Sequence, residues 1–324
     1  MKTRIHLPLC IRLLPVLLFF LQLIACDDAT DFQNTKVKYP TGSIPETVTS
    51  FESANSEYDD YNSGPPLVLA LNFPLYFSSN RSSQGGTFDI ISMDVQALFD
   101  QDTGHFSMSA GYSGTAWPGN NPTSNEYGPF VASLATGSTI HLYANDVNGN
   151  LDIYHVVGNG SVTASNALNS SSDDAYPTFG QDNSIYFSSN RGGDFDIYLV
   201  TIQMGTDLLT WLPGTGIVVV TKADALSSAS NDICPYINGN LLVFTSDRPG
   251  GYGGYDLYYS EYGPAGWSAP MNFGPSINSA YDEYRPAVIY APDYSNDLML
   301  FSSNRPGKGG FDLYYVGIPK RTGR

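Results

Sequence analysis

A short motif that recurs along the chain is the feature that most limits its possible folds. Four copies read Phe, Ser or Thr, Ser, Asn or Asp, Arg, and a degenerate copy lies between the first two. The copies occupy residues 77–81, 142–146, 187–191, 244–248 and 301–305. A motif that recurs roughly every 45–65 residues is the signature of stacked structural repeats.

The residues around each copy are repeated as well. A Gly-rich turn follows the motif, and then come an aromatic residue or Leu, an Asp and an apolar run, as in Phe195-Asp196. Two β-rich runs joined by a few residues that include Gly predict a hairpin. An acidic residue lies upstream of each copy, close before a Pro; these acids are Asp60, Glu126, Asp174, Asp232 and Glu283. Each repeat therefore predicts four antiparallel strands.

These repeats predict an all-β, five-bladed β-propeller of four-stranded antiparallel blades over residues 40–319. The 23 Tyr, 17 Phe and 32 Gly agree with many short strands and tight turns. The last repeat has no room for a fourth strand, but residues 55–61 resemble residues 278–284. Residues 44–49, which precede the first of these stretches, therefore predict an N-terminal strand that closes the ring. Six blades are the alternative, if a divergent blade lies before residue 146.

The N-terminus predicts export and a lipid anchor. Residues 1–25 have a basic start and then an apolar run that ends in Leu23-Ile24-Ala25-Cys26, as in a bacterial lipoprotein signal peptide. A transmembrane anchor is the alternative, but the uninterrupted apolar run is about 12 residues and a spanning helix needs roughly 20. We therefore expect lipidation at Cys26, a tether over residues 26–39, and a short tail over residues 320–324. The membrane and the leaflet stay open.

The net charge limits the possible binding partners, and the cysteine content limits the possible disulfides. The formal charge is −16, and loss of the basic signal peptide makes the mature chain more negative still. Such a chain repels phosphate backbones, so nucleic acid is excluded as a partner. After removal of Cys10 and lipidation of Cys26, Cys234 has no partner for a disulfide, so the fold must rest on packing.

The repeats resemble the WD-like propeller repeat of TolB-type periplasmic proteins, in which Ser-Asp/Asn-Arg, a Gly turn and Asp-Ile-Tyr follow an apolar strand. Residues 266–312 also resemble propellers that accompany peptidoglycan-binding domains of the OmpA type. The resemblance implies a lipid-anchored protein of the cell envelope, on the periplasmic face of the outer membrane or at the cell surface. It implies a non-catalytic interaction scaffold whose partners are envelope proteins, including peptidoglycan-associated ones.

Candidate site residues gather on one rim of the predicted ring. The repeated charged residues are interpreted as structural, each Arg bracing its hairpin through the Asp that opens the next strand; they are Arg81, Arg191, Arg248, Arg305, Asp89, Asp196, Asp256 and Asp312. A charged ring that captures a peptide or glycan is the alternative. Non-repeated tyrosines are better contact candidates: Tyr58, Tyr61, Tyr252, Tyr281 and Tyr284.

Signals for metal binding and catalysis are weak. Asp146, Asn148, Asn150 and Asp152 alternate as calcium ligands do, but Gly149 stands at the fourth loop position where calcium loops have Gly at the sixth. No metal, cofactor or catalytic residue is therefore assigned, and the chain is predicted not to be an enzyme. The alternative is a surface lipoprotein that binds or processes glycans, with carboxylates in the propeller pore.

Overall fold

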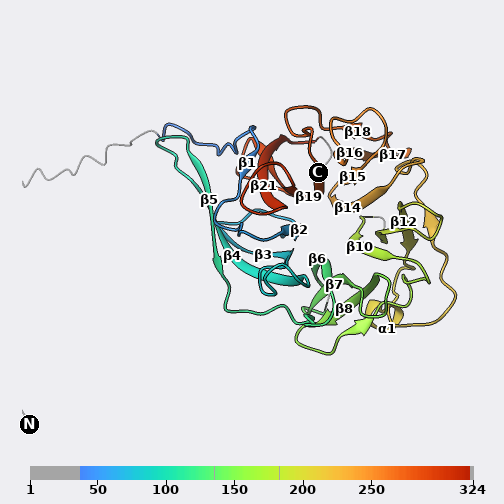
Figure 1. Ribbon diagram of the computed structural model, residues 1–324. Coiled ribbons are helices and arrows are strands. Elements are labelled where there is room, and N and C mark those ends of the chain that lie inside the picture. The colour runs from blue at the N-terminus through green and yellow to red at the C-terminus, as the bar shows by residue number, and fades with distance from the viewer. Residues whose placement is uncertain (1–36, 135, 182, 322–324) are drawn as a thin grey trace, which may run out of the picture. The chain divides into compact units, whose positions relative to one another are not determined.

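The computed structural model describes residues 37–134, 136–181 and 183–321, and these form a five-bladed β-propeller. The blades follow one another around a central axis in chain order (Figure 1). The predicted signal peptide, Cys26 and most of the predicted tether lie outside the described residues. No helix within the described ranges is long and apolar enough to cross a membrane.

Blades 1 to 4 are continuous in sequence, and each runs from the axis outward through hydrogen-bonded antiparallel strands. Blade 1 consists of β2 (Asp60–Gly64), β3 (Asn72–Ser79), β4 (Asp89–Phe99) and β5 (Phe106–Tyr112). Blade 2 consists of β6 (Glu126–Ser133), β7 (Thr139–Asn145), β8 (Asp152–Val157) and β9 (Thr163–Ala164). Blade 3 consists of β10 (Asp174–Phe179), β11 (Ser184–Ser189), β12 (Asp196–Thr201) and β13 (Thr221–Lys222). Blade 4 consists of β14 (Asp232–Asn238), β15 (Leu241–Ser246), β16 (Asp256–Gly263), β17 (Gly266–Trp267) and β18 (Met271–Asn272).

Blade 5 joins the two ends of the chain and confirms the predicted ring closure. Its inner strands are β19 (Glu283–Ile289), β20 (Asn296–Ser303) and β21 (Asp312–Pro319), and its outer strand is β1 (Thr49–Ser50). Thr49 pairs with Tyr315, and the Asn296 side chain donates to the Ile44 carbonyl at 2.8 Å and accepts from its N–H at 2.9 Å. The N-terminal segment therefore seals the last blade, as the sequence predicted.

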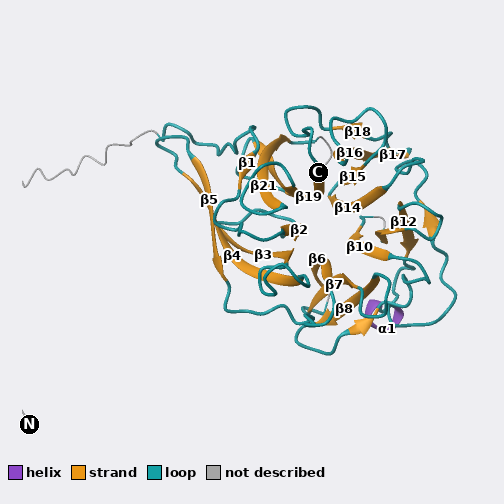
Figure 2. Ribbon diagram, in the orientation of Figure 1, coloured by secondary structure: helices purple, strands orange, loops and turns teal. Residues whose placement is uncertain are grey.

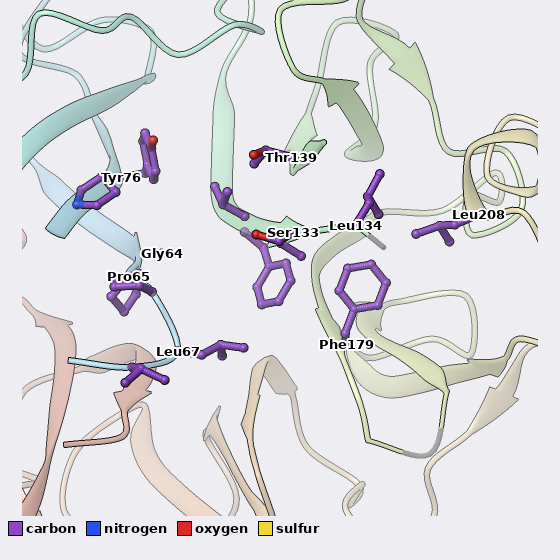
Figure 3. A pocket seen from close by; sticks show the side chains of 15 residues that line it. Gly64, Pro65, Leu67, Tyr76, Ser133, Leu134, Thr139, Phe179 and Leu208 are labelled. Atoms are coloured by element: carbon purple, nitrogen blue, oxygen red, sulfur yellow. The ribbon is translucent and has the colours of Figure 1, made fainter. Parts of the chain in front are cut away.

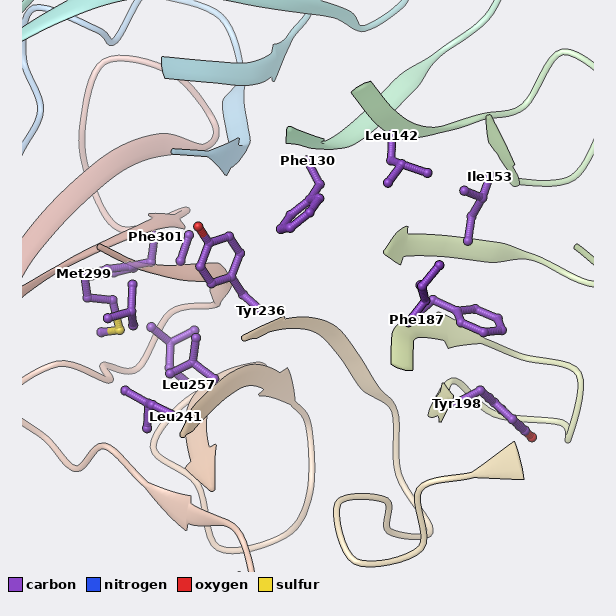
Figure 4. Packing of buried hydrophobic residues seen from close by; sticks show 14 of the residues in the cluster. Phe130, Leu142, Ile153, Phe187, Tyr198, Tyr236, Leu241, Leu257, Met299 and Phe301 are labelled. Carbon is purple, nitrogen blue, oxygen red and sulfur yellow. The ribbon is translucent and has the colours of Figure 1, made fainter. Parts of the chain in front are cut away.

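The core lies between the blades. The aromatic residues that open the motif copies Phe77, Phe187, Phe244 and Phe301 are fully buried, and Figure 4 shows Phe187 and Phe301 among the packed side chains of the largest cluster. Each blade buries these side chains against its neighbour, which is why a single blade is not stable alone. The only helix of the described residues, α1 (Leu208–Trp211), is a single turn outside blade 3 (Figure 2).

Adjacent blades are also joined by a set of hydrogen bonds that recurs at every blade junction. The residue that makes these bonds stands directly before the strand-opening acid. Its side-chain oxygen accepts a hydrogen bond from a backbone N–H of the preceding blade. The same side chain also forms a hydrogen bond with a side chain in the motif of its own blade. The pairs within the blades are Asp59 with Asn80, Asn125 with Asp146, Asp173 with Asn190, Asn231 with Asp247, and Asp282 with Asn304. Each pair combines one carboxylate with one amide, in either order. In some blades the carboxylate precedes the strand-opening acid and the amide lies in the motif, and in the others the two are reversed.

Candidate functional site

The first strands of all five blades share an irregularity that shapes the centre of the ring. Their ladders shift register just after the opening acid, and the residue at the shift has a positive φ of 50–60°. These residues are Asn62, Gly128, Tyr176, Cys234 and Arg285. A non-Gly residue in this conformation is strained by roughly 1–3 kcal/mol, and such strain is typical of functional or tightly constrained positions.

The contacts of Arg285 show that these bulged residues meet at the axis. Arg285 belongs to blade 5, yet its guanidinium lies 5.3 Å from the Tyr176 ring of blade 3. Its two terminal nitrogens point to the carbonyls of Pro235 in blade 4 and Pro129 in blade 2, at 3.4 and 3.5 Å. One side chain can contact three other blades only if it crosses the centre of the ring. The channel is therefore closed at this level by protein side chains.

Aromatic residues surround the axis next to this plug. Tyr61, which follows the opening acid of blade 1, lies between the rings of Tyr127 and Tyr284, at centroid distances of 5.9 and 6.4 Å. Phe88 and Phe311, which precede the third strands of blades 1 and 5, contact Tyr61 at 5.1 and 5.6 Å. We call the group Tyr61, Tyr127, Tyr176, Tyr284 and Arg285 the axial site. It lies at the face of the ring that carries the motif turns, called here the turn face.

The electrostatics of the axial site follow from burial. Desolvation raises the pKa of Tyr61, Tyr176 and Tyr284 well above the usual phenol value, so these hydroxyls are protonated donors. Burial also raises the pKa of the Cys234 thiol to about 12, so it is no nucleophile. None of the five axial-site residues carries a carboxylate. The axial site therefore offers aromatic faces, phenol donors and one cation.

The repeated arginines have structural partners. Arg81, Arg191, Arg248 and Arg305 pair with the acids that open the first strands of their own blades, at 2.5–2.8 Å: Asp60, Asp174, Asp232 and Glu283. Each guanidinium also stacks on the Phe of its own motif, at 5.1–5.4 Å. The partner is thus the acid upstream of the motif, whereas the sequence suggested the Asp downstream of it.

The downstream Asp residues have partners other than the repeated arginines. Asp196 pairs with Lys222 at 2.6 Å. Asp256 accepts from the backbone N–H of Tyr252 at 2.7 Å, and Asp312 accepts from that of Lys308 at 2.5 Å. Burial raises the pKa of Asp89. Asp256 and Asp312 therefore hold the turns of their own hairpins, whereas Asp196 ties its strand to the outer strand β13.

Blade 2 departs from the other blades, and the structure corrects the position of its motif. Glu126 pairs in the ladder with Asn145, whereas Asp60 pairs with Ser79. The degenerate copy is therefore residues 143–147, one residue later than the sequence suggested, and Val147 occupies the arginine position. The Asn145 amide donates to Glu126 Oε1 at 2.5 Å in place of a guanidinium. Among the described residues, Glu126 is the strand-opening acid that has no ion-pair partner.

The missing arginine changes the chemistry of Glu126. Its Oε2 is buried and has no hydrogen-bond partner among the described residues. Desolvation raises its pKa to about 8, and the nearby charges of Asp89 and Asp146 add to the shift. A carboxylic acid that keeps its proton at neutral pH is the property required of a general acid. The sequence signal that could have pointed to Glu126 is the absence of Arg from the motif of one of the five repeats.

The remaining sequence-derived candidates are spread over the rim. The structure brings Tyr61 and Tyr284 together in the axial site, while Tyr252 and Tyr281 stay exposed on the rim, and Tyr58 lines a surface hollow beside Arg81. The four calcium candidates bond to different protein groups, for example Asp146 to Asn125 and Asn148 to Tyr154. The described residues contain no group of three His, Cys, Asp or Glu side chains placed to hold a metal.

A separate pocket opens on the face opposite the motif turns, between blades 1, 2 and 3. It has a volume of about 830 Å³ and is mostly apolar, with Leu67, Phe179 and Leu208 in its wall (Figure 3). Its polar side chains are the hydroxyls of Tyr76, Ser133 and Thr139. No Asp, Glu, His, Lys, Arg or Cys of the described part of the chain lines it, so the three hydroxyls have no charged group or general base beside them in the pocket. This pocket suits an apolar group and offers no evident chemistry.

Comparisons with known proteins place the fold among glycoside hydrolases. The chain is similar to a thermostable family-43 glycoside hydrolase, with 14% identity and a TM-score of 0.54, over 85% of this chain and 95% of that one. It is similar to the endo-arabinase of Bacteroides thetaiotaomicron, with 12% identity and a TM-score of 0.54, over 88% and 99% of the two chains. No family model matches the sequence. No curated protein matches it.

These matches correct three predictions made from the sequence. The resemblance to TolB-type propellers was wrong, because the similar solved structures are glycoside hydrolases. The predictions of a non-catalytic interaction scaffold and of a protein without enzymatic activity rested on that resemblance and are overturned by the same matches. At 12–14% identity, the matches show a shared five-bladed fold and leave the activity of this chain to be argued from its own residues.

Proposed function

We propose that this protein binds a glycan at the axial site and processes it. The observation that carries the proposal is the group of aromatic side chains around the axis on the turn face. Tyrosines present an apolar ring and a polar hydroxyl together, which suits a sugar with its C–H faces and hydroxyl edges. The likeness of the ring to glycoside hydrolases supports the same class of ligand.

The proposal assigns a proton donor as well. Hydrolysis of a glycosidic bond needs a carboxylic acid that protonates the leaving oxygen. Glu126 and Tyr127 are consecutive residues of β6, so their side chains point to opposite faces of blade 2. The pKa of Glu126, about 8, keeps its carboxyl protonated at neutral pH. Because the carboxyl is fully buried, the side chains that cover it must move before a sugar reaches it. Glu126 is therefore the first residue to test for a role in turnover.

The experiment combines binding and product release on a panel of plant and bacterial polysaccharides. We expect Tyr284→Ala and Tyr127→Ala to weaken binding about tenfold each, because each removes a stacking surface. The matched control is Tyr252→Ala, which removes an exposed tyrosine of the rim and should leave binding unchanged.

Turnover is tested separately with Glu126→Gln, which keeps the shape of the side chain but cannot donate the carboxylic proton. Product release should fall about 100-fold or more while binding persists. Binding without product release from the wild type would limit the function to recognition. Absence of both from every polysaccharide would refute the proposal.

A further inference from the structure

Arg285 differs from every other arginine in the described part of the chain. Arg81, Arg191, Arg248 and Arg305 pair with buried acids, and Arg321 lies 3.3 Å from Glu261. Arg285 has no carboxylate partner among the described residues, although its side chain is fully buried. An unpaired buried ion costs several kcal/mol. The stability of the fold alone does not explain a cation at this position.

The hydrogen bonds of Arg285 are also incomplete. A guanidinium has five N–H donors. Its two carbonyl contacts, at 3.4 and 3.5 Å, lie at the long limit of hydrogen bonding, and Nε has no partner among the described residues. The equivalent positions in blades 2, 3 and 4 hold Gly128, Tyr176 and Cys234, so the bulged backbone itself does not require an arginine. The cation therefore has donors to spare for a ligand.

A second polar side chain in the neighbouring blade is similarly free. Asn62 occupies the same position in blade 1, its side chain is fully buried, and neither atom of its amide has a hydrogen-bond partner in the described structure. The ring of blades places blade 1 beside blade 5, which carries Arg285. The Asn62 backbone N–H donates to the Ser302 hydroxyl of blade 5 at 3.1 Å, so the bulge of blade 1 packs directly against that blade. An amide donor and a guanidinium with unused N–H groups are together suited to an anion with planar oxygens.

We propose that Arg285 binds the carboxylate of an acidic sugar, so that the glycan recognised at the axial site contains a uronic acid. This inference rests on the proposed function and specifies its substrate class. The carboxylate accepts from the fork of the guanidinium and from the Asn62 amide, while the sugar ring stacks on the tyrosines. Because the side chain of Arg285 is covered, the tyrosine rings must turn aside as the carboxylate enters.

The charge of the whole chain refines the expected ligand. At a formal charge of −16, the protein repels a polyanion at a distance. The attraction of Arg285 is local, because the surrounding arginines are already neutralised by acids. We therefore expect an oligosaccharide with a single uronic acid to bind more tightly than a continuous polyuronate of the same length.

The test is calorimetric titration of the intact mature protein with matched trisaccharides. One ligand contains a single galacturonate, the second is its methyl ester, the third is a neutral arabinose trisaccharide, and the fourth carries a sulfate ester in place of the carboxylate. We expect the acid to bind about tenfold or more tightly than its methyl ester, because a charge-assisted bidentate bond is lost on esterification. Tighter binding of the sulfated sugar would overturn the carboxylate assignment.

Variants locate the preference. Arg285→Gln should bind the acid and the ester equally, and Arg285→Lys should retain part of the preference because it keeps the charge without the fork. The control is Arg321→Gln, which alters an arginine outside the axial site and should leave the preference intact. Should Arg285→Gln fail to fold, the Lys variant and the titrations of the wild type with the acid and with its methyl ester still test whether Arg285 binds the carboxylate. Equal binding of acid and ester to the wild type overturns this inference but leaves the proposed function standing, whereas no binding of any trisaccharide refutes both.

Discussion

Blade 2 and blade 4 share the same three inner strands, but they neutralise the strand-opening acid in different ways. In blade 4 the guanidinium of Arg248 pairs with Asp232 and stacks on Phe244 at 5.1 Å. In blade 2 Val147 replaces the arginine, and Glu126 is held by the neutral groups of Asn145 and Ser124. The acid of blade 4 is thus part of an ion pair, whereas the acid of blade 2 keeps its proton. A buried acid in this repeat thus needs a counter-charge or a raised pKa.

The largest effect should come from breaking the ion pair of blade 4. Arg248→Met leaves Asp232 as an uncompensated buried carboxylate, and we expect a loss of about 3–5 kcal/mol in the free energy of unfolding. Chemical denaturation measures it. Val147→Ala at the equivalent position of blade 2 is the control and should change stability by about 0.5 kcal/mol or less. A loss below about 1 kcal/mol for Arg248→Met would show that the pair contributes little.

A smaller effect should appear in the pH dependence of stability. Because the folded state raises the pKa of Glu126 to about 8, it holds a proton that the unfolded chain has already released above about pH 4.5. The unfolded state binds fewer protons in this window, so Glu126 lowers stability as the pH rises from about 4.5 to 8. Thermal unfolding of wild type and Glu126→Gln across this range isolates the effect. Parallel curves would contradict it.

The smallest effect should come from restoring the repeat. Asn145→Ser with Val147→Arg gives blade 2 the Ser and Arg found in blade 4. The new guanidinium should pair with Glu126, lower its pKa and make stability less sensitive to pH between about 4.5 and 8. We expect a gain of about 1 kcal/mol or less at pH 8, measured by denaturation. An unchanged pH dependence would mean that the arginine does not reach the acid.

The repeated residues predicted the ring well, because every blade uses them for the same packing. The five blades and the closing strand before residue 50 followed from them. The degenerate motif was misplaced by one residue, since Asn145 matched the motif by letter while the ladder pairs it with Glu126.

The axial site was hard to predict for the opposite reason. Its residues stand between the acid and the Pro, a stretch that differs in length and side chains from blade to blade. Two of them, Tyr176 and Arg285, occupy the bulge, whose positive φ the sequence does not display. The family was misassigned for the same reason. The resemblance rested on motifs that stabilise the blades, whereas the function depends on the residues at the centre, which differ between blades.

The seam between β1 and β21 also governs the order of folding during synthesis. Residues 44–50 leave the ribosome before any blade, but their partners in β20 and β21 are made only after blades 1 to 4. Until the final strands emerge, the nascent chain carries an unpaired edge at each end, and such edges promote association between molecules. A chain cut short before residue 312 would have no strand on which to seal, so closure of the ring depends on β21.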